Sequence, residues 1–268
     1  MPAMSPEQLL HYFDLGQLWS PEDRASTPAD LAAAYQQALA VRRLRQQRGE
    51  VPRGYKIGFT NRTIWPIYDV YAPIWGTVWD SGLALCEGEG ELDLTGTCQP
   101  RLEPEVVFGF RATPVPDASP QQLFDAIEWM APGYEVVQTH CLNWQFVASE
   151  TVADSALHAR LLIGQRVPLR DLARDADALN AMLAQARIML SRNGQAVAQG
   201  QGANVLDSPL LALHHFVREL RQCPGATDLQ PGDVVTTGTW TDAFAIAPGE
   251  CWTAQFSSPL PSLTVRMR

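Results

Sequence analysis

Apolar side chains recur at helical spacing through the first fifty residues. Residues 5–8 (Ser-Pro-Glu-Gln) supply an N-cap, a proline at the first helical position and a capping-box glutamine, and Leu9 and Phe13 follow on one side. A second start lies at residues 27–30 (Thr-Pro-Ala-Asp), and apolar positions between 31 and 39 then repeat close to the 3.6-residue period. The pattern predicts a small helical N-terminal part.

After residue 50 the pattern changes, first to glycine, proline and tryptophan and then to short apolar runs. Residues 51–80 are predicted to form loops and short strands that bridge two parts of the protein. Further on, Asn193-Gly194 is a strong signal for a type I′ hairpin. Strands are predicted at 83–86, 106–110, 186–191, 195–199, 234–237, 251–256 and 263–266.

Two helices are predicted to interrupt this strand-rich part. One begins at Ser119 and continues through the apolar positions between 123 and 130, and the other begins at residues 207–209 (Asp-Ser-Pro). The fold class is therefore α+β. We expect an N-terminal helical part with bridging loops (1–79), followed by a β-rich domain (80–268).

Composition narrows the class of protein. The chain has 268 residues, of which 46% are hydrophobic, and this is enough for a sizeable core. Its net charge of −9 disfavours nucleic acids and anionic membranes as partners, but a local cation would still permit a small anionic substrate. The five widely spaced cysteines are typical of reduced thiols in a cytoplasmic protein. The sequence contains no run of 18 apolar residues, so no membrane-spanning segment is predicted.

Glu103 and Glu105 stand two residues apart in a segment that otherwise has the composition of a buried strand. Residues i and i+2 of a strand point to the same face, so the two carboxylates are expected side by side. Neighbouring carboxylates in apolar surroundings repel each other and lose hydration, and a divalent cation would offset both effects. Because Pro104 separates them, a solvated edge strand is the alternative.

Glu135 lies in a second apolar segment and is a third candidate ligand. Three carboxylates and water suit Mg²⁺ or Mn²⁺, with positions left open for substrate oxygens. The alternative is an ion pair between Glu135 and an arginine such as Arg101.

Three further segments carry candidate chemistry. Lys56 lies between two glycines; a partly desolvated lysine can act as a base or hold a substrate carboxylate, whereas a solvated loop lysine is the alternative. Asp154 and His158 are four residues apart and would share a helix face, either for proton transfer or as a simple helix pair. Residues 237–239 (Thr-Gly-Thr) end a strand and can direct N–H groups and hydroxyls at an anion.

Taken together, these segments resemble the 2-keto-4-pentenoate hydratase / 4-oxalocrotonate decarboxylase group of the fumarylacetoacetate hydrolase superfamily. The resemblance runs from about Gly54 to the C-terminus. Its matching pieces occur in family order: Tyr55-Lys56-Ile57-Gly58-Phe59-Thr60, Glu103-Pro104-Glu105, Tyr134-Glu135-Val136-Val137, Asn143-Trp144, Thr151-Val152-Ala153-Asp154 and Gly232-Asp233-Val234-Val235.

The resemblance implies a mixed β-roll core with a smaller N-terminal helical part, in a homo-oligomer. It also implies that Glu103, Glu105 and Glu135 ligate Mg²⁺ or Mn²⁺, and that Lys56 lies in the active site with Asp80 as a companion. The remaining candidates are Asp154 as a catalytic residue and, for substrate binding, Thr60, Thr237, Gly238 and Trp240.

The chain departs from the family pattern at several positions. Glu150 and Ser155 stand where hydratases tend to have aspartate and asparagine, and Asn61 replaces a frequent serine. Trp240 adds bulk to a segment that lines the pocket in relatives. These changes bear on the substrate more than on the metal.

The function that the resemblance implies is a metal-dependent hydratase, a lyase that adds water to a 2-hydroxy-2,4-dienoate or its 2-oxo tautomer in meta-cleavage catabolism of aromatic compounds. The cation would polarise the 2-oxygen of the substrate, and Lys56 would move the proton. Three alternatives remain open: decarboxylation of a 4-oxalocrotonate-type diacid, hydrolysis of a carbon–carbon bond in an acylpyruvate, and a non-catalytic partner of a related pathway enzyme.

Overall fold

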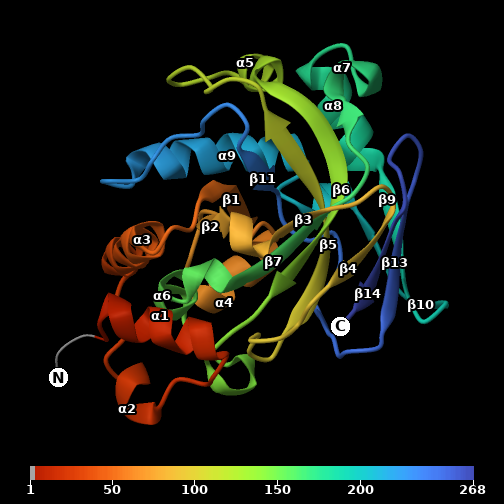
Figure 1. Cartoon of the computed structure of the whole chain (residues 1–268). Coiled ribbons are helices and arrows are strands. Elements are labelled where there is room, and N and C mark those ends of the chain that lie inside the picture. The colour runs from red at the N-terminus through yellow and green to blue at the C-terminus, as the bar shows by residue number, and fades with distance from the viewer. Residues whose placement is uncertain (1–3) are drawn as a thin grey trace.

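The computed structural model describes residues 4–268 and contains two β-sheets, with helices to the left of and above them in the view of Figure 1. The larger sheet has the strand order β2-β1-β11-β5-β6-β7-β3, with β12 beside β5 and β8 beside β6. Its strands are β1 (Pro52–Gly58), β2 (Ile74–Trp79), β3 (Leu83–Leu85), β5 (Arg101–Phe110), β6 (Ile127–Val137), β7 (His158–Ile163), β8 (Val167–Pro168), β11 (Val234–Thr236) and β12 (Phe244–Ala245).

The smaller sheet has the order β10-β9-β13-β14-β4 and packs against one side of the larger sheet. Buried side chains from both sheets form one core, which includes Leu102, Tyr134, Trp252 and Val265. The strands are β4 (Glu89–Leu92), β9 (Arg187–Arg192), β10 (Gln195–Gln201), β13 (Cys251–Phe256) and β14 (Leu263–Met267).

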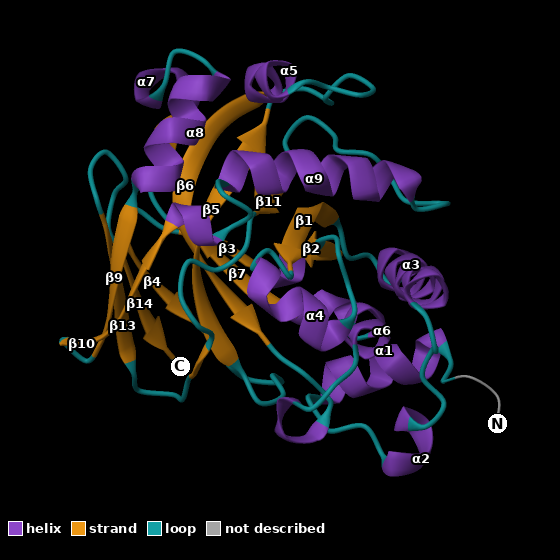
Figure 2. Cartoon of the chain, turned by 180° about the vertical axis from the view of Figure 1, so that it is seen from behind, coloured by secondary structure: helices purple, strands orange, loops and turns teal. Residues whose placement is uncertain are grey.

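Helices lie in two groups, as the view from behind shows (Figure 2). One group joins α1 (Pro6–Leu15), α2 (Pro21–Arg24), α3 (Leu31–Gln47), α4 (Trp65–Tyr68) and α6 (Ala148–Ala153) beside the edge of the sheet formed by β1 and β2. The other group contains α5 (Pro120–Ala126), α7 (Leu169–Leu172), α8 (Ala176–Gln185) and α9 (Pro209–Gln222).

Local sequence signals account for many of these elements. The capping box at Ser5 forms as predicted, and Asn193 and Gly194 adopt the two left-handed conformations that a type I′ hairpin between β9 and β10 requires. The helix predicted from Ser119 ends at Ala126, however, and Ile127 and Met130 belong to β6. Apolar residues spaced three apart fit a buried strand as well as a helix, and pairing with β5 decides for the strand.

The first 79 residues are joined to the rest by sheet pairing. β1 runs parallel to β11, with Lys56 opposite Thr236, and antiparallel to β2. β1 and β2 are part of the same sheet as β5 and β6, so the sheet itself does not mark a boundary at residue 79. The division there remains a prediction.

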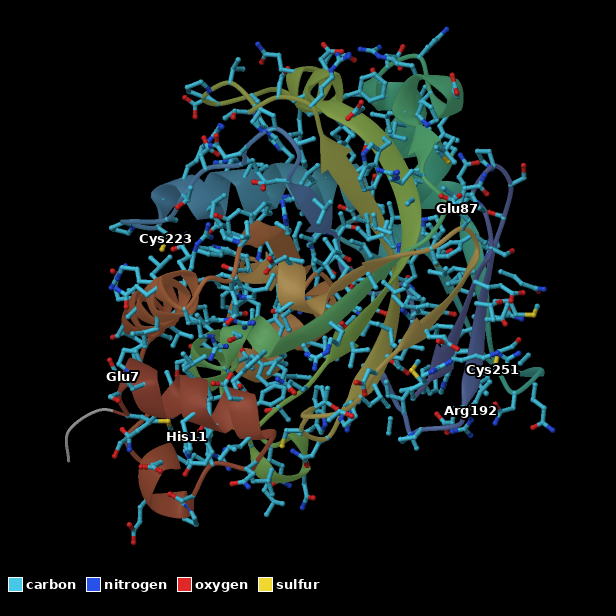
Figure 3. The ribbon with its side chains drawn as sticks, in the orientation of Figure 1. Glu7, His11, Glu87, Arg192, Cys223 and Cys251 are labelled. Carbon is cyan, nitrogen blue, oxygen red and sulfur yellow. The ribbon has the colours of Figure 1, made fainter. Side chains whose placement is uncertain are left out.

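All five cysteines are free, and Cys223 and Cys251 are well separated in the molecule (Figure 3). Within residues 4–268, no helix has the length and apolar composition needed to cross a membrane.

Candidate active site

Three carboxylates meet where β5 and β6 pair. Glu103 and Glu105 lie on one face of β5, and the register places Glu135 of β6 directly opposite Glu103. One ligand oxygen from each residue lies within 4.8 Å of the other two. Glu105 and Glu135 are fully buried, so the edge-strand alternative is wrong: β5 is an interior strand flanked by β11 and β6.

Two oxygens of this cluster lack a hydrogen-bond partner. Glu105 Oε2 accepts hydrogen bonds from the hydroxyl of Thr236 and from the backbone N–H of Gly238 at 2.7 Å, whereas Glu105 Oε1 has no partner in the described part of the chain. Glu135 Oε2 is likewise buried and unpartnered. A buried carboxylate oxygen without a partner is costly, so these two acceptor oxygens call for a ligand that the protein itself does not supply.

Lys56 supplies a cation at the same place. Its ammonium group donates to the carbonyl of Ala156 at 3.0 Å and lies 3.2 Å from Glu135 Oε1. An ammonium group has three N–H donors, so one remains for the pocket that Lys56 lines. Lys56 is only 3% exposed and lies in β1, so the solvated-loop alternative is wrong.

His158 completes the contacts of Glu135. The ring Nδ1 lies 2.8 Å from Glu135 Oε1, the oxygen that Lys56 also contacts. Lys56 and His158, not Arg101, are therefore the partners of Glu135. Both contacts fall on one oxygen, which leaves the other oxygen without a partner among the described residues.

The pKa values of the three glutamates show that the site has too little positive charge to balance three ionised carboxylates. Burial, together with repulsion from Glu135, raises the pKa of Glu103 to about 7 and the pKa of Glu105 well above its usual range. Burial acts to raise the pKa of Glu135 too, but Lys56 and His158 outweigh it and the pKa is lowered. Burial lowers the pKa of Lys56, yet the three carboxylates outweigh this and the net shift is upward. Lys56 is thus a protonated cation, not the free base that partial desolvation alone predicts.

The donor set fits a hard divalent cation. It consists only of carboxylate oxygens, two of them unpartnered, and one positive side chain does not neutralise it. Oxygen ligands of this kind suit Mg²⁺ or Mn²⁺.

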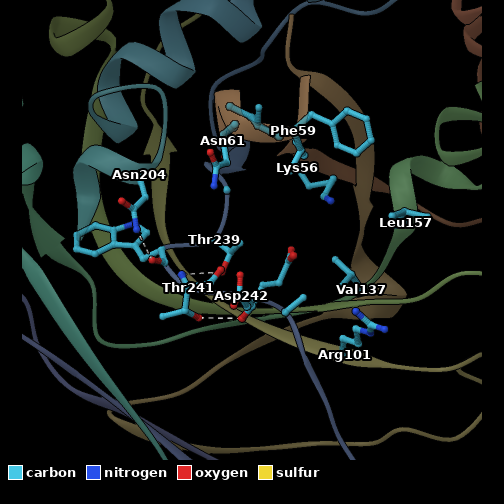
Figure 4. A pocket seen from close by; sticks show the side chains of 18 of the residues that line it. Lys56, Phe59, Asn61, Arg101, Val137, Leu157, Asn204, Thr239, Thr241 and Asp242 are labelled. Carbon is cyan, nitrogen blue, oxygen red and sulfur yellow. Dashed lines mark hydrogen bonds between the residues drawn. The ribbon is translucent and has the colours of Figure 1, made fainter. Parts of the chain in front are cut away.

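A pocket of about 440 Å³ adjoins the cluster at Glu103 and is seen from close by in Figure 4. Glu103 and Lys56 lie on its wall, and Arg101 lies beside Val137 at another part of the lining. One side is aromatic, because Tyr68, Trp144 and Phe146 line it.

Two of the predicted substrate-binding residues, Thr60 and Gly238, meet at this pocket. Gly238 has φ +105°, and a Cβ there would lie 2.1 Å from Thr60 Oγ1. Only glycine fits this junction, and its N–H is the donor that holds Glu105.

Thr237 and Trp240 differ from each other in placement. The Thr237 hydroxyl donates to the Val106 carbonyl at 2.9 Å and does not line the pocket, so its predicted substrate contact is wrong. Alternate residues face opposite sides of a strand, and Thr236 is the one directed at Glu105. Trp240 lines the pocket but is fully buried, and its ring packs edge-on against Phe256.

Asp80 does not lie beside Lys56, so the prediction that it is a catalytic companion of Lys56 is wrong. Lys56 pairs with Gly76 in β2, and Asp80 lies four residues further along, roughly 13 Å away. Its carboxylate accepts N–H groups of Val51 and Ser81, each at 2.9 Å.

Because Asp80 caps a turn outside the pocket, Asp80→Asn should leave kcat within about threefold of the parent value. Steady-state kinetics on a dienol substrate would test this. A loss of activity as large as that of a Lys56 variant would restore Asp80 to the catalytic group.

Asp154 pairs with a different histidine from the one predicted. Helix α6 ends at Ala153, and residues 155–157 have left-handed backbone angles, so Asp154 and His158 do not share a helix face. Asp154 instead lies 2.5 Å from Nδ1 of the buried His140 and also accepts its backbone N–H. It does not line the pocket, and a catalytic role for it has no support from this geometry.

Sequence reasoning missed Thr236, His158 as a partner of Glu135, and the aromatic wall. No local signal identifies Thr236, because its place opposite Lys56 follows from the pairing of β11 with β1, which lie far apart in the chain. His158 and the aromatic wall come from segments whose positions only long-range pairing fixes.

A β-roll in which three carboxylates converge beside a buried lysine, next to a pocket, is the architecture of a metal-binding protein that acts on small molecules. Residues 88–266 match the family described as fumarylacetoacetate (FAA) hydrolase C-terminal. The chain belongs to this family.

Two relatives and one solved structure illustrate the similarity. The chain is 29% identical over 220 residues to a 2-hydroxyhexa-2,4-dienoate hydratase of Comamonas testosteroni, covering 81% of this chain and 79% of the relative. It is 30% identical over 226 residues to a TodF product hydratase of Pseudomonas putida, covering 82% and 78%. The structure of 4-oxalocrotonate decarboxylase from Pseudomonas putida G7, complexed with magnesium and adipate, aligns with a TM-score of 0.87 over 98% of this chain and 95% of that chain, at 23% identity.

Proposed function

We propose that the protein is a Mg²⁺- or Mn²⁺-dependent hydratase that adds water to a 2-hydroxy-2,4-dienoate or its 2-oxo-4-enoate tautomer in meta-cleavage catabolism of aromatic compounds. The observation that carries this proposal is the cluster of Glu103, Glu105 and Glu135 beside Lys56, of which Glu103 and Lys56 line one pocket. The names of the two hydratases to which the chain is similar support the reaction class.

In this proposal, Glu103, Glu105 and Glu135 would hold the metal. The bound cation would supply Lewis-acid polarisation of the 2-oxo and carboxylate oxygens of the substrate. Thr236 and Gly238 would fix the orientation of Glu105, and His158 would fix that of Glu135.

Lys56 would be the proton carrier. Its ammonium group is held by the Ala156 carbonyl and Glu135, and its third N–H is free to point into the pocket. It would donate this proton to the far end of the conjugated chain and regain the proton that the 2-hydroxyl loses, so tautomerisation leaves the lysine protonated as before.

Decarboxylation of a 4-oxalocrotonate-type diacid is the second candidate. The observation in its favour is the similarity of fold to a 4-oxalocrotonate decarboxylase over nearly the whole chain. Acylpyruvate hydrolysis and a non-catalytic partner role are the remaining alternatives.

Product identity tests the proposal against these alternatives. Purified protein with Mg²⁺ would be incubated separately with 2-hydroxypenta-2,4-dienoate, 4-oxalocrotonate and an acylpyruvate. The proposal predicts a 4-hydroxy-2-oxo acid from the dienoate. Carbon dioxide release from the diacid without hydration of the dienoate would mark the decarboxylase, and turnover of none of the three would favour the non-catalytic role.

Removal of metal should abolish hydration reversibly. Chelation with EDTA followed by dialysis is expected to lower kcat by about a thousandfold, because the site then lacks the charge that stabilises the substrate oxygens. Added Mg²⁺ or Mn²⁺ should restore the rate. Full activity of protein shown by elemental analysis to be metal-free would contradict the proposal.

Three broader features also remain proposals. The cysteine usage supports a cytoplasmic location, and the family resemblance supports a homo-oligomer that associates with a related pathway enzyme. The division into an N-terminal part (1–79) and a catalytic domain (80–268) agrees with a family match that begins at residue 88.

A further inference from the structure

Arg101 is a cation in the pocket that the proposed chemistry does not use. It is the first residue of β5, two positions before Glu103, so both side chains leave the same face of the strand. Among residues 4–268, no hydrogen bond or ion pair holds its guanidinium group. The group lies over the ring of Trp144, with its central carbon 4.1 Å from the ring centroid.

The ring of Trp144 is the platform on which the guanidinium group of Arg101 lies. The indole Nε1 donates to the Gln99 carbonyl at 3.0 Å, which holds the ring in place. An arginine stacked on an aromatic ring keeps the edges of its planar fork free to donate, and that fork matches a carboxylate in a bidentate manner. The five N–H donors of Arg101 are therefore available to a ligand in the pocket.

An apolar wall connects the carboxylate cluster to this cation. Trp144 contacts Phe146 at a centroid distance of 6.1 Å, and Phe146 stacks on Tyr68 at 5.5 Å. All three line the same pocket as Glu103 and Arg101. The Cα of Arg101 lies about 7 Å along β5 from that of Glu103. The guanidinium group, held over Trp144, is still near enough to Glu103 for its charge to act to lower the pKa of that carboxyl.

We propose that Arg101 binds a second carboxylate, at the tail of the substrate, and that the protein therefore prefers dicarboxylic 2-oxo acids over monocarboxylic ones of the same length. This inference rests on the proposed function, in which the 2-oxo acid head group binds at the glutamate cluster. The aromatic wall packs against the unsaturated carbon chain, and Arg101 receives the charge at its far end.

A matched pair of ligands tests the inference. Dissociation constants of 2-oxohexanoate and 2-oxohexanedioate, which differ only in the terminal carboxylate, would be measured by calorimetry with saturating Mg²⁺. The parent protein is expected to bind the diacid at least about tenfold more tightly. Arg101→Gln, and Arg101→Met as a second variant, should lose this preference while the affinity for the monoacid stays nearly unchanged.

Arg166→Gln is the matched control, because Arg166 also lies over a tryptophan, Trp129, but outside the pocket. It should keep the preference. Absence of a preference in the parent, or its survival in both Arg101 variants, would overturn the inference. Equal weakening of both ligands would also overturn it, because Arg101 would then act on the shared head group.

Oxalate binding separates this inference from the proposed function. Oxalate carries the head group without a tail, so it should bind every variant equally in the presence of Mg²⁺. Failure of the parent protein to bind oxalate with Mg²⁺ would contradict the proposed function itself. Normal oxalate binding without a diacid preference would overturn only the role of Arg101.

Discussion

Replacing Glu105 by glutamine is expected to abolish metal binding and hydratase activity together. The amide can keep the hydrogen bonds from Thr236 and Gly238 by placing its oxygen where Oε2 lies. Its NH₂ group then faces the cluster in place of the unpartnered Oε1. A negative ligand is thus replaced by a donor, and the rate should fall by about a thousandfold or more.

The fold should survive this substitution. Glu105 is fully buried beside two other carboxylates, so a neutral amide removes repulsion from the metal-free protein. We expect the melting temperature without metal to stay the same or rise, and the increase that Mg²⁺ produces in the parent protein to disappear. Glu128→Gln is the matched control, since Glu128 is an exposed glutamate on β6, the strand that carries Glu135. Retention of Mg²⁺-dependent stabilisation by Glu105→Gln would remove Glu105 from the ligand set.

Replacing Lys56 by methionine is expected to separate metal binding from catalysis. Methionine retains an unbranched apolar side chain within β1 but removes the N–H groups that contact Ala156 and Glu135. Loss of a positioned proton donor should lower kcat by about 10²- to 10⁴-fold. The three glutamates remain, and a neighbouring positive charge is removed, so Mg²⁺ should bind at least as tightly as in the parent protein.

Lys56 is the only lysine in the chain, so Lys56→Arg serves as the comparison. Arginine keeps the charge, but its larger guanidinium group does not fit the space around Lys56, whose side chain is only 3% exposed. Activity should therefore remain low. Calorimetric Mg²⁺ titration and kcat would be measured on the same preparations. A fully active Lys56→Met protein would assign the proton to another group.

Local patterns predict the parts of this site that lie within one strand. The alternation of side chains along a strand is sufficient to place Glu103 and Glu105 on one face of β5. The same rule misassigns Thr237, because the faces of β11 depend on its register with β5, and this register directs Thr236 at Glu105.

Parts of the site built from distant segments are not predictable in this way. Asp80 and Asp154 are candidate catalytic residues in the sequence analysis, yet one caps a turn and the other pairs with His140. The direction of each side chain follows from where its helix or strand ends, and three left-handed residues after Asp154 redirect the chain before His158. The pairing of Glu135 with Glu103 likewise depends on the register of β6 against β5, which no local spacing encodes.

The fold shows the same division. The hairpin at residues 193–194 and the helix starts at Ser5 and Ser119 follow from turn and capping chemistry. The end of the Ser119 helix does not, because Ile127 and Met130 gain more by pairing and burial in β6 than by extending a helix. Tertiary pairing therefore decides the boundaries that local signals leave ambiguous.

The location of the metal tests the account most directly. Crystals grown with Mn²⁺ and oxalate would be measured at a wavelength where manganese scatters anomalously. The account predicts one strong anomalous peak between Glu103, Glu105 and Glu135, at about 2.0–2.3 Å from a carboxylate oxygen of each, with oxalate on its open side. A well-ordered structure with no peak among these three carboxylates, or with the manganese held elsewhere in the chain, would contradict it.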